Sequence, residues 1–461
     1  MTSIDPFAPV ELQHPGAGLS LHILPYGLIP HRLLLNVRQD GPLHPSSGIE
    51  GGGSATHDLL TGPEEPNHHQ TYGRSFFGPV IGRYANRLPA GKQKYGHGQE
   101  MLVPVWGGEN LCLHGGPASG PNGGPPVSLP LISQDDVPLQ EGPLDTIVWT
   151  PLSNVSKAEL FKDQDLSDPV NGSKAPQGSA RVFAINHRPS SDGSGPPVTL
   201  RIEALIAVQG PSDPAVSSED VPPLGLSAGK VRIEYRAEQR RSGKEEAVPT
   251  PLNLTHHWAF NLSASDPSAR QTEKGTIEQH ELRMLVRGKE EERTLELDSR
   301  SVPLGQLKAA DGEYDFHATG KEGFGRLIGE KAPPGGHDHW HGWGPTLPKG
   351  EARTVLRSPL TKIGVLFSTD QSGVQLYCAT GQPAYPATSS KGGPKKRLHR
   401  SEKDTDEGKL GNHLHSACFL EFAHPHATAL FEPLQKWAGT DTLLREGRTY
   451  RAFVQAEVYE P

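Results

Sequence analysis

The sequence predicts an all-β protein built from antiparallel strands and many turns, and three observations support this prediction. Its 461 residues include 53 glycines and 44 prolines, which divide the chain into short segments. Many of these segments alternate apolar and polar residues, as strands with one buried face do. Only 34% of the residues are hydrophobic, so we expect one large core that carries polar loops.

The predicted strands follow one another along most of the chain. An early hairpin is expected where a Pro-Gly turn separates the apolar runs Leu19–Leu24 and Leu33–Val37. An antiparallel meander is expected further on, and its last run, Val231–Tyr235, alternates strictly. The other predicted strands are Arg181–Ile185, Val198–Val208, Glu278–Asp298, Thr354–Tyr377, Ala417–Ala423 and Thr449–Tyr459.

Two segments have the composition of loops inserted between strands. Residues 117–178 are rich in Pro, Gly, Ser and Asp, and only Thr146–Trp149 is strand-like. Residues 387–412 contain a Lys-, Gly- and Asp-rich run whose basic half could contact an anion. The acidic residues of the same run favour a charged surface loop instead. We therefore expect a single domain over residues 1–461 with loop insertions at 117–178 and 387–412.

Charge and cysteine content exclude several classes of protein. A net charge of -8, from 45 basic and 53 acidic residues, argues against a protein that binds the nucleic-acid backbone. No run approaches the roughly 18 apolar residues of a membrane span, and the N-terminus lacks a signal-peptide pattern. The three cysteines are far apart and odd in number, so no disulfide framework is expected. We expect a cytoplasmic protein with no nucleic-acid or membrane partner, and its oligomeric state stays open.

The segment Thr250–Leu262 is predicted to be a strand with two chemically different faces. Counting by two from Leu252 gives an apolar face that also includes His256, to which we assign a structural role. The other face carries His257 between residues that form hydrogen bonds. A histidine that lines a polar cleft is available for proton transfer near neutral pH. A hydrogen-bonded strand histidine without a chemical role is the alternative interpretation.

Glu421 is the best candidate for a catalytic base. It lies in the predicted strand Ala417–Ala423, on the same face as Phe419, so its neighbours are largely apolar. A carboxylate in such a strand is costly unless it is paired or partly protonated, and this favours a chemical role. A rim glutamate paired with a surface lysine or arginine is the alternative.

Four further segments are rich in side chains that bind hydroxyl groups. They supply amide, guanidinium, imidazole and carboxylate groups, which donate to or accept from vicinal diols. We expect the glycines after His114 to permit close approach of a ligand. The candidate residues are Asn86, Arg87, His114, Asp338 and Gln375.

Taken in order, these motifs resemble the aldose 1-epimerases, or galactose mutarotases, over roughly residues 76 to 425. The matching motifs are Gly-Arg-x-Ala-Asn-Arg at 82–87, Leu-His-Gly-Gly at 113–116, Thr-Pro-x-Asn-Leu-Thr-x-His at 250–257, Gly-Val-Gln-x-Tyr at 373–377 and a late Leu-Glu at 420–421. Gly312–Phe316 suggests the family's Gly-x-x-Asp-Phe segment. Five motifs in one order make the resemblance specific.

The resemblance implies a large antiparallel β-sandwich whose curved face holds a sugar. It also implies interconversion of the α and β anomers of a free hexose such as glucose or galactose, without a cofactor. The glutamate matched by Glu421 would take the proton of the anomeric hydroxyl, and the histidine matched by His257 would protonate the ring oxygen. Asn86, Arg87, His114, Asp338 and Gln375 match the sugar-contacting positions of the family.

The chain departs from the family pattern at two places. Ala259 stands where an aromatic hydroxyl is expected, so we expect one sugar contact to be missing. The usual Tyr-Asp-His-Asn becomes His337-Asp-His-Trp340, which is expected to alter the pocket wall and places the substrate range in doubt.

Three other functions compete with this interpretation. The histidines at 337, 339 and 341 with Asp338 suggest a zinc site, but no further spacing signature supports it, and we expect no metal. A hexose-6-phosphate epimerase would need an added arginine or lysine pocket for the phosphate. A carbohydrate-binding protein without turnover is the third alternative.

Overall fold

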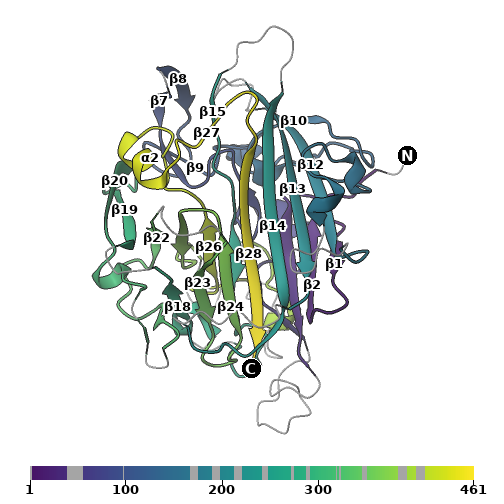
Figure 1. The fold of residues 1–461 in the computed structure, drawn as a ribbon, viewed down its shortest axis with the longest axis vertical. Coiled ribbons are helices and arrows are strands. Elements are labelled where there is room, and N and C mark those ends of the chain that lie inside the picture. The colour runs from purple at the N-terminus through teal and green to yellow at the C-terminus, as the bar shows by residue number, and fades with distance from the viewer. Residues whose placement is uncertain are drawn as a thin grey trace.

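The regular structure of the computed structural model consists mostly of strands, with very few helices, as predicted (Figure 1). The described residues form two short α-helices, α1 (His68–Thr71) and α2 (Glu432–Ala438), and the 3-10 turns include η3 (Leu144–Thr146), η9 (Gly312–Tyr314) and η10 (Arg397–His399). The structure describes residues 3–38, 56–96, 98–166, 175–188, 198–211, 221–240, 248–270, 275–286, 291–317, 319–320, 323–344, 350–382, 392–400 and 411–461.

Ten strands form the largest sheet. Its order is β10-β12-β13-β14-β28-β24-β23-β18-β21, and β11 pairs with β12 off this path. All pairs are antiparallel except β10 with β12. The bounds are Leu139–Glu141 (β10), Thr150–Pro151 (β11), Ala180–Arg188 (β12), Thr199–Gln209 (β13), Leu226–Arg240 (β14), Glu281–Met284 (β18), Arg326–Leu327 (β21), Ala352–Arg357 (β23), Gly364–Thr369 (β24) and Tyr450–Glu460 (β28).

A six-stranded antiparallel sheet and a four-stranded antiparallel sheet accompany it. The six-stranded order is β17-β26-β25-β22-β19-β20, and the four-stranded order is β1-β2-β3-β4. The bounds are Trp258–Phe260 (β17), Cys418–Phe422 (β26), Gly373–Tyr377 (β25), Asp338–Gly342 (β22), Arg293–Leu297 (β19), Pro303–Ala309 (β20), Val10–Gln13 (β1), Leu19–Leu24 (β2), Ile29–Asn36 (β3) and Thr56–Asp58 (β4).

Four two-stranded sheets complete the described strands. Three of them pair segments that are distant in sequence, and β7 with β8 is a local hairpin. The pairs are β5 (Val80–Ile81) with β16 (Thr255–His256), β6 (Arg87–Pro89) with β9 (Leu111–Leu113), β7 (Gly91–Tyr95) with β8 (Gln99–Val103), and β15 (Thr250–Pro251) with β27 (Leu443–Leu444).

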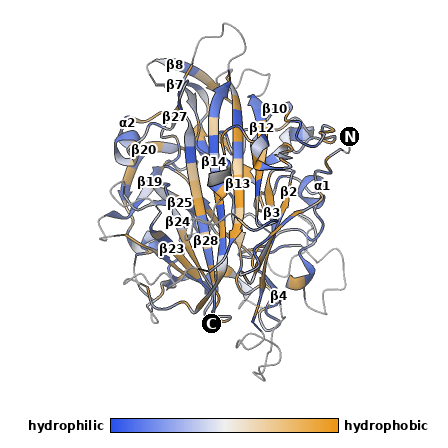
Figure 2. Cartoon of the chain, turned by 45° about the vertical axis from the view of Figure 1, so that its right-hand side comes forward, coloured by the Kyte–Doolittle hydropathy of each residue, from blue (hydrophilic) through white to orange (hydrophobic). Residues whose placement is uncertain are grey.

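One hydrophobic core joins the three larger sheets into a β-sandwich. Strand β14 shows why: Val231, Ile233 and Tyr235 point into the core, while Arg232 and Glu234 pair with each other on the opposite face. The same core takes residues from the six-stranded sheet and from the β1–β4 sheet. Figure 2 shows hydrophobic residues distributed along these strands, interrupted by hydrophilic ones. The predicted all-β sandwich is thus confirmed, and each fully buried aliphatic side chain contributes about 1.5–3 kcal/mol.

The predicted meander is confirmed, because β12, β13 and β14 pair in succession. The prediction of one continuous strand over Thr250–Leu262 is wrong. The segment forms three short strands, β15, β16 and β17, because each pairs with a different partner: β27, β5 and β26. The run Glu278–Asp298 likewise divides between β18 in the large sheet and β19 in the six-stranded sheet.

The segment 117–178 is more than a loop where the structure describes it. Its strands β10 and β11 extend the large sheet, and Trp149 is fully buried in the core. The predicted strand at Thr146–Trp149 lies slightly early, because the ladder begins at Thr150.

Lys396, in the second predicted insertion, lies in the interior, so the interpretation as a charged surface loop is wrong for this residue. Its Nζ lies 2.9 Å from a carboxylate oxygen of Asp58 and donates to Leu60 O at 2.7 Å, and both charged side chains are fully buried. Burial lowers the pKa of Lys396 to about 8. This ion pair fastens residues 392–400 to β4. Residues 387–391 and 401–410 lie outside the described residues.

We expect the protein to lose stability as the pH falls below about 6.5. Burial lowers the pKa of a group of interior histidines from 6.5 to values of about 3 or about 4. Below pH 6.5 these histidines bind protons in the unfolded chain but stay neutral in the folded chain. The free energy of unfolding therefore falls by up to about 1.4 kcal/mol per pH unit for each histidine. The members of the group are His69, His187, His256, His280, His341 and His399.

Urea unfolding at several pH values measures this loss. Glu292 opposes it with one proton, because burial raises the pKa of Glu292 to about 8 and the folded state keeps that proton longer. A His280→Gln variant should show a shallower pH dependence by about one proton. An unfolding free energy that stays constant between about pH 7 and pH 4.5 would contradict the prediction.

Candidate functional site

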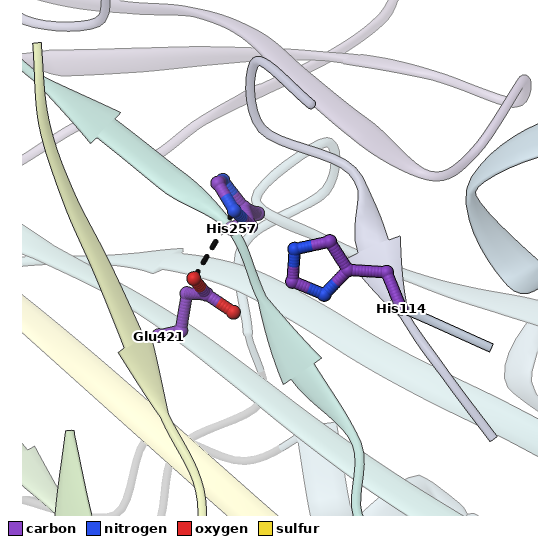
Figure 3. Close-up of side chains that lie close together, drawn as sticks. All are labelled: His114, His257 and Glu421. Carbon is purple, nitrogen blue, oxygen red and sulfur yellow. Dashed lines mark ion pairs between the residues drawn. The ribbon is translucent and has the colours of Figure 1, made fainter. Parts of the chain in front are cut away.

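His257 and Glu421 face each other at the centre of the candidate site. In the β17–β26 ladder Trp258 lies opposite Leu420, so the next positions along the two strands are His257 and Glu421. His257 Nε2 lies 3.1 Å from Glu421 Oε1, and both side chains are at least 96% buried (Figure 3). An imidazole and a carboxylate at this distance can exchange protons with a group placed between or beside them.

The predicted two faces of these strands are present. Trp258 and Leu420 point into the core, whereas His257 and Glu421 lie on the opposite face. His256 points inward, where its Nε2–H donates to Leu28 O at 2.9 Å and its Nδ1 accepts from the Tyr235 hydroxyl. These contacts support the structural role assigned to His256.

His114, at the end of β9, extends its ring toward the pair (Figure 3). Its ring packs edge-on to that of His257, with centroids 5.1 Å apart. The Asn86 backbone N–H donates to His114 Nδ1 at 3.3 Å, which places the proton of a neutral ring on Nε2. Burial, followed by the nearby His257 and Arg87, lowers the pKa of His114 well below its usual value. The ring is therefore a neutral Nε2–H donor at physiological pH.

A hydrogen-bonded network lies beside this trio. Arg87 Nη2 donates to Asp338 Oδ2 at 2.6 Å, and Arg87 Nη1 donates to Asn86 Oδ1 at 2.8 Å. Gln375 Nε2 donates to Asp338 Oδ1 at 2.6 Å. Gln375 also stands directly opposite Glu421 in the β25–β26 ladder. The structure thus brings all seven predicted site residues together, and their roles remain predictions.

Three buried polar atoms of the site have no hydrogen-bond partner within the described residues: Glu421 Oε2, His257 Nδ1 and Gln375 Oε1. Leaving such atoms unpaired costs about 1–3 kcal/mol each. Asp338 reaches the surface with 37% of its side chain exposed, so the network opens to solvent on that side. A ligand rich in hydroxyl groups would satisfy the unpaired donors and acceptors.

Aromatic residues that the motif analysis did not single out as site residues enclose the pair. Phe419 packs on the His257 ring at 4.7 Å between centroids, and Phe76 packs on both His114 at 4.7 Å and His257 at 5.8 Å. Tyr377 stacks on Phe419 at 5.3 Å. Phe419 shares a face with Glu421 by period-two counting, so its position beside the site could be predicted from the sequence. The position of Phe76 could not be predicted, because it depends on contacts between separate segments.

The two departures from the family pattern have a structural context. Ala259 is buried opposite Phe419 and packs with Phe77, so aromatic rings occupy its surroundings. Trp340 lies directly opposite Gln375 and is covered by Leu434 and Trp437 of helix α2. The Trp340 side chain therefore fills the space between strand β22 and helix α2.

Glycines 115 and 116 allow tight packing between protein segments, and the close approach of a ligand stays a prediction. Gly115 has a φ of +81°, and a Cβ there would lie 2.3 Å from the backbone oxygen of Gly82. A Cβ on Gly116 would contact Pro104 and Cys112. The glycines thus let the loop that carries His114 pack against neighbouring protein segments.

Metal binding is poorly supported at this site. His114, His257 and Glu421 form the one group in the described ranges whose ligand atoms lie close enough for a shared ion, within 4.8 Å of one another. The proton on His114 Nε2 directs a donor, not a lone pair, toward the others. The residues of the alternative zinc site at 337–341 do not converge on one point either. His337 and His341 pack against Phe316, while Asp338 binds Arg87.

The fold and the site together define a β-sandwich protein with a buried histidine–glutamate pair, His257 and Glu421, on its polar face. The family model described as "Aldose 1-epimerase" matches residues 226–412, and this match confirms the family resemblance predicted from the motifs. The matched segment contains His257, Asp338 and Gln375. No helix among the described residues is both long and apolar enough to cross a membrane.

Solved structures show the same fold. A GalM/aldose epimerase homologue from C. elegans aligns with a TM-score of 0.62 at 16% identity, covering 100% of this chain and 99% of that one. Galactose 1-epimerase from Lactobacillus acidophilus NCFM aligns with a TM-score of 0.56 at 16% identity, covering 98% of this chain and 93% of that one. No protein of curated function matches the sequence significantly.

Substituting Gly115 by alanine should destabilise the protein and displace His114. The backbone strain of a positive φ costs about 1–2 kcal/mol, and the clash with Gly82 O adds to it. Gly91→Ala is the matched control, because Gly91 has a φ of +91° with open space around it. Urea unfolding of both variants measures the difference. Equal losses of stability would mean that the Gly82 contact does not hold the loop.

Proposed function

We propose that the protein is an aldose 1-epimerase that interconverts the α and β anomers of a free hexose such as glucose or galactose. The observation that carries the proposal is the buried 3.1 Å contact between His257 Nε2 and Glu421 Oε1 beside a network of hydroxyl-binding side chains. The family-model match and the epimerase-like fold support it.

The reaction needs one acid and one base that act on neighbouring oxygens. Glu421 removes the proton of the anomeric hydroxyl as the C1–O bond becomes a carbonyl, and protonated His257 delivers a proton to the ring oxygen as the C1–ring-oxygen bond breaks. Rotation about the C1–C2 bond exposes the other face of the aldehyde. The ring oxygen then attacks that face, its proton returns to His257, and the proton on Glu421 returns to the new anomeric hydroxyl.

The surroundings assign supporting roles to the other residues. The Nε2–H of His114 points toward the His257–Glu421 pair and would stabilise negative charge that develops on a sugar oxygen bound there. Asp338 and Gln375 would bind hydroxyl groups further along the sugar, because their network opens to solvent. These residues need no cofactor for this chemistry.

A phosphorylated hexose is the nearest alternative substrate. It would require a cation able to bind phosphate. Arg87 at the site is paired with Asp338, and Arg74 just outside the site is paired with Asp145. This engagement favours the free sugar.

Polarimetry of freshly dissolved α-D-glucose and α-D-galactose tests the proposal. The protein should accelerate the approach to an unchanged equilibrium rotation and so rank the two sugars. Absence of acceleration, with sugar binding still detected by calorimetry, would instead indicate a carbohydrate-binding protein. Acceleration confined to hexose 6-phosphates would shift the assignment to the phosphosugar branch.

Removing either member of the proton-transfer pair should abolish most of the rate. We expect Glu421→Gln and His257→Asn each to lower kcat by about 10²- to 10⁴-fold, because general acid and base catalysis contributes on this scale. His256→Asn is the matched control: it alters the adjacent histidine on the core face and should lower stability while the folded protein keeps its rate. Full activity in either site variant would reject the assigned roles.

A further inference from the structure

Arg74 lies just outside the proton-transfer pair with every part of its guanidinium group engaged. Its Nε and Nη2 each donate to the Asp145 carboxylate at 2.8 Å, and its Nη1 donates to Gly116 O at 2.8 Å. Both charged side chains are at least 95% buried. A bidentate, buried arginine–carboxylate pair has a fixed geometry that lysine cannot reproduce.

Two contacts of Arg74 lead to rings of the site. The guanidinium lies 5.0 Å from the centroid of the Phe76 ring, and Phe76 packs on both His114 and His257. The carbonyl that Arg74 binds belongs to Gly116, in the same tight loop as His114. Arg74 thus contacts two supports of the histidines without contacting the histidines themselves.

Asp145 provides a rigid anchor for this arginine. It lies in η3, within the segment 117–178, next to the core residue Leu144. The Leu144 N–H donates to Gly82 O at 3.4 Å, and a Cβ on Gly82 would clash with the Leu144 side chain. Gly115, in the loop that carries His114, also packs against Gly82 O. Both η3 and the His114 loop therefore pack against Gly82.

We infer that Arg74 and Asp145 form a positioning pair, which holds Phe76 and the His114 loop in register with the His257–Glu421 pair. This inference rests on the proposed epimerase function for its catalytic consequence. It assigns a role to η3 of the segment 117–178: its residues Leu144 and Asp145 supply the anchor of the site. Neither Arg74 nor Asp145 needs to contact the sugar.

The charge of Arg74 has a separate effect on His114. The titratable and charged groups around that ring are His257, Glu421, Arg87, Arg74 and His426. Burial is the largest cause of the low pKa of His114, and the positive charge of Arg74 lowers that pKa further. Removing this charge lets the pKa of His114 rise, so protonation begins at a higher pH.

Two substitutions separate geometry from charge. Arg74→Lys keeps the positive charge but cannot form the two parallel hydrogen bonds to Asp145. Arg74→Met loses both the charge and these hydrogen bonds. We expect kcat/KM for mutarotation to fall about 10- to 100-fold in both variants, mostly through kcat, because Asp338 and Gln375 are undisturbed. The acidic limb of the pH–rate profile should move to higher pH in Arg74→Met and stay in place in Arg74→Lys. Asp145→Asn should resemble the lysine variant.

A second buried arginine–carboxylate pair provides the control. Arg357 Nη1 donates to Glu281 Oε2 at 2.7 Å, and the guanidinium lies 3.9 Å from the Phe324 ring, in strands β18 and β23 of the large sheet. Arg357→Lys should lower the thermal midpoint as Arg74→Lys does, with the kcat and pH profile of the wild type. A purely structural role for Arg74 would make the two lysine variants equivalent in rate.

Histidine-selective ¹⁵N NMR keeps the inference testable without turnover. The His114 signal should show a neutral Nε2–H ring at pH 7 in the wild type and titrate at higher pH in Arg74→Met. An inactive wild type with this difference would refute the proposed function while upholding the positioning pair. An active wild type whose rate and His114 signal are unchanged in Arg74→Lys, Arg74→Met and Asp145→Asn would overturn the inference.

Discussion

The hydrogen-bonding register of β26 between its two neighbours is the constraint on which the site depends. Opposite positions of antiparallel strands share a face, so the ladders place His257, Glu421 and Gln375 in one row. The same register directs Leu420 and its cross-strand partners Trp258 and Leu376 into the core. A slip by one residue would turn Glu421 inward and Leu420 outward, which the core forbids. Core packing therefore fixes the relative position of His257 and Glu421.

Period-two alternation was sufficient to predict the two faces of these strands and the residues His257 and Glu421. It could not predict where the strands end, since β15, β16 and β17 are separated by changes of pairing partner. Contacts such as Arg74 with Asp145, or Lys396 with Asp58, depend on folding distant segments together. A charged residue in a polar segment is predicted to be exposed, and only tertiary structure reveals a buried partner.

The site keeps charged and polar groups in surroundings that would otherwise be apolar. Phe76 and Phe419 enclose the His257 ring, which excludes water and strengthens electrostatic interactions nearby. Such an arrangement is costly for stability, and replacing the polar groups by well-packed apolar ones would often be neutral or favourable. Local conflicts of this kind are expected at functional sites, where the rest of the fold compensates for them.

The position of the last strands has a consequence for how the chain folds. Strand β26 lies between β17 and β25, and β28 lies between β14 and β24, so late segments occupy interior positions in both large sheets (Figure 1). Until these segments arrive, both sheets present unpaired strand edges, which are prone to pair with other chains. Contacts between distant segments also slow folding. A nascent or truncated chain is therefore exposed to aggregation until its final strands insert, and a chaperone that shields strand edges would act during that interval.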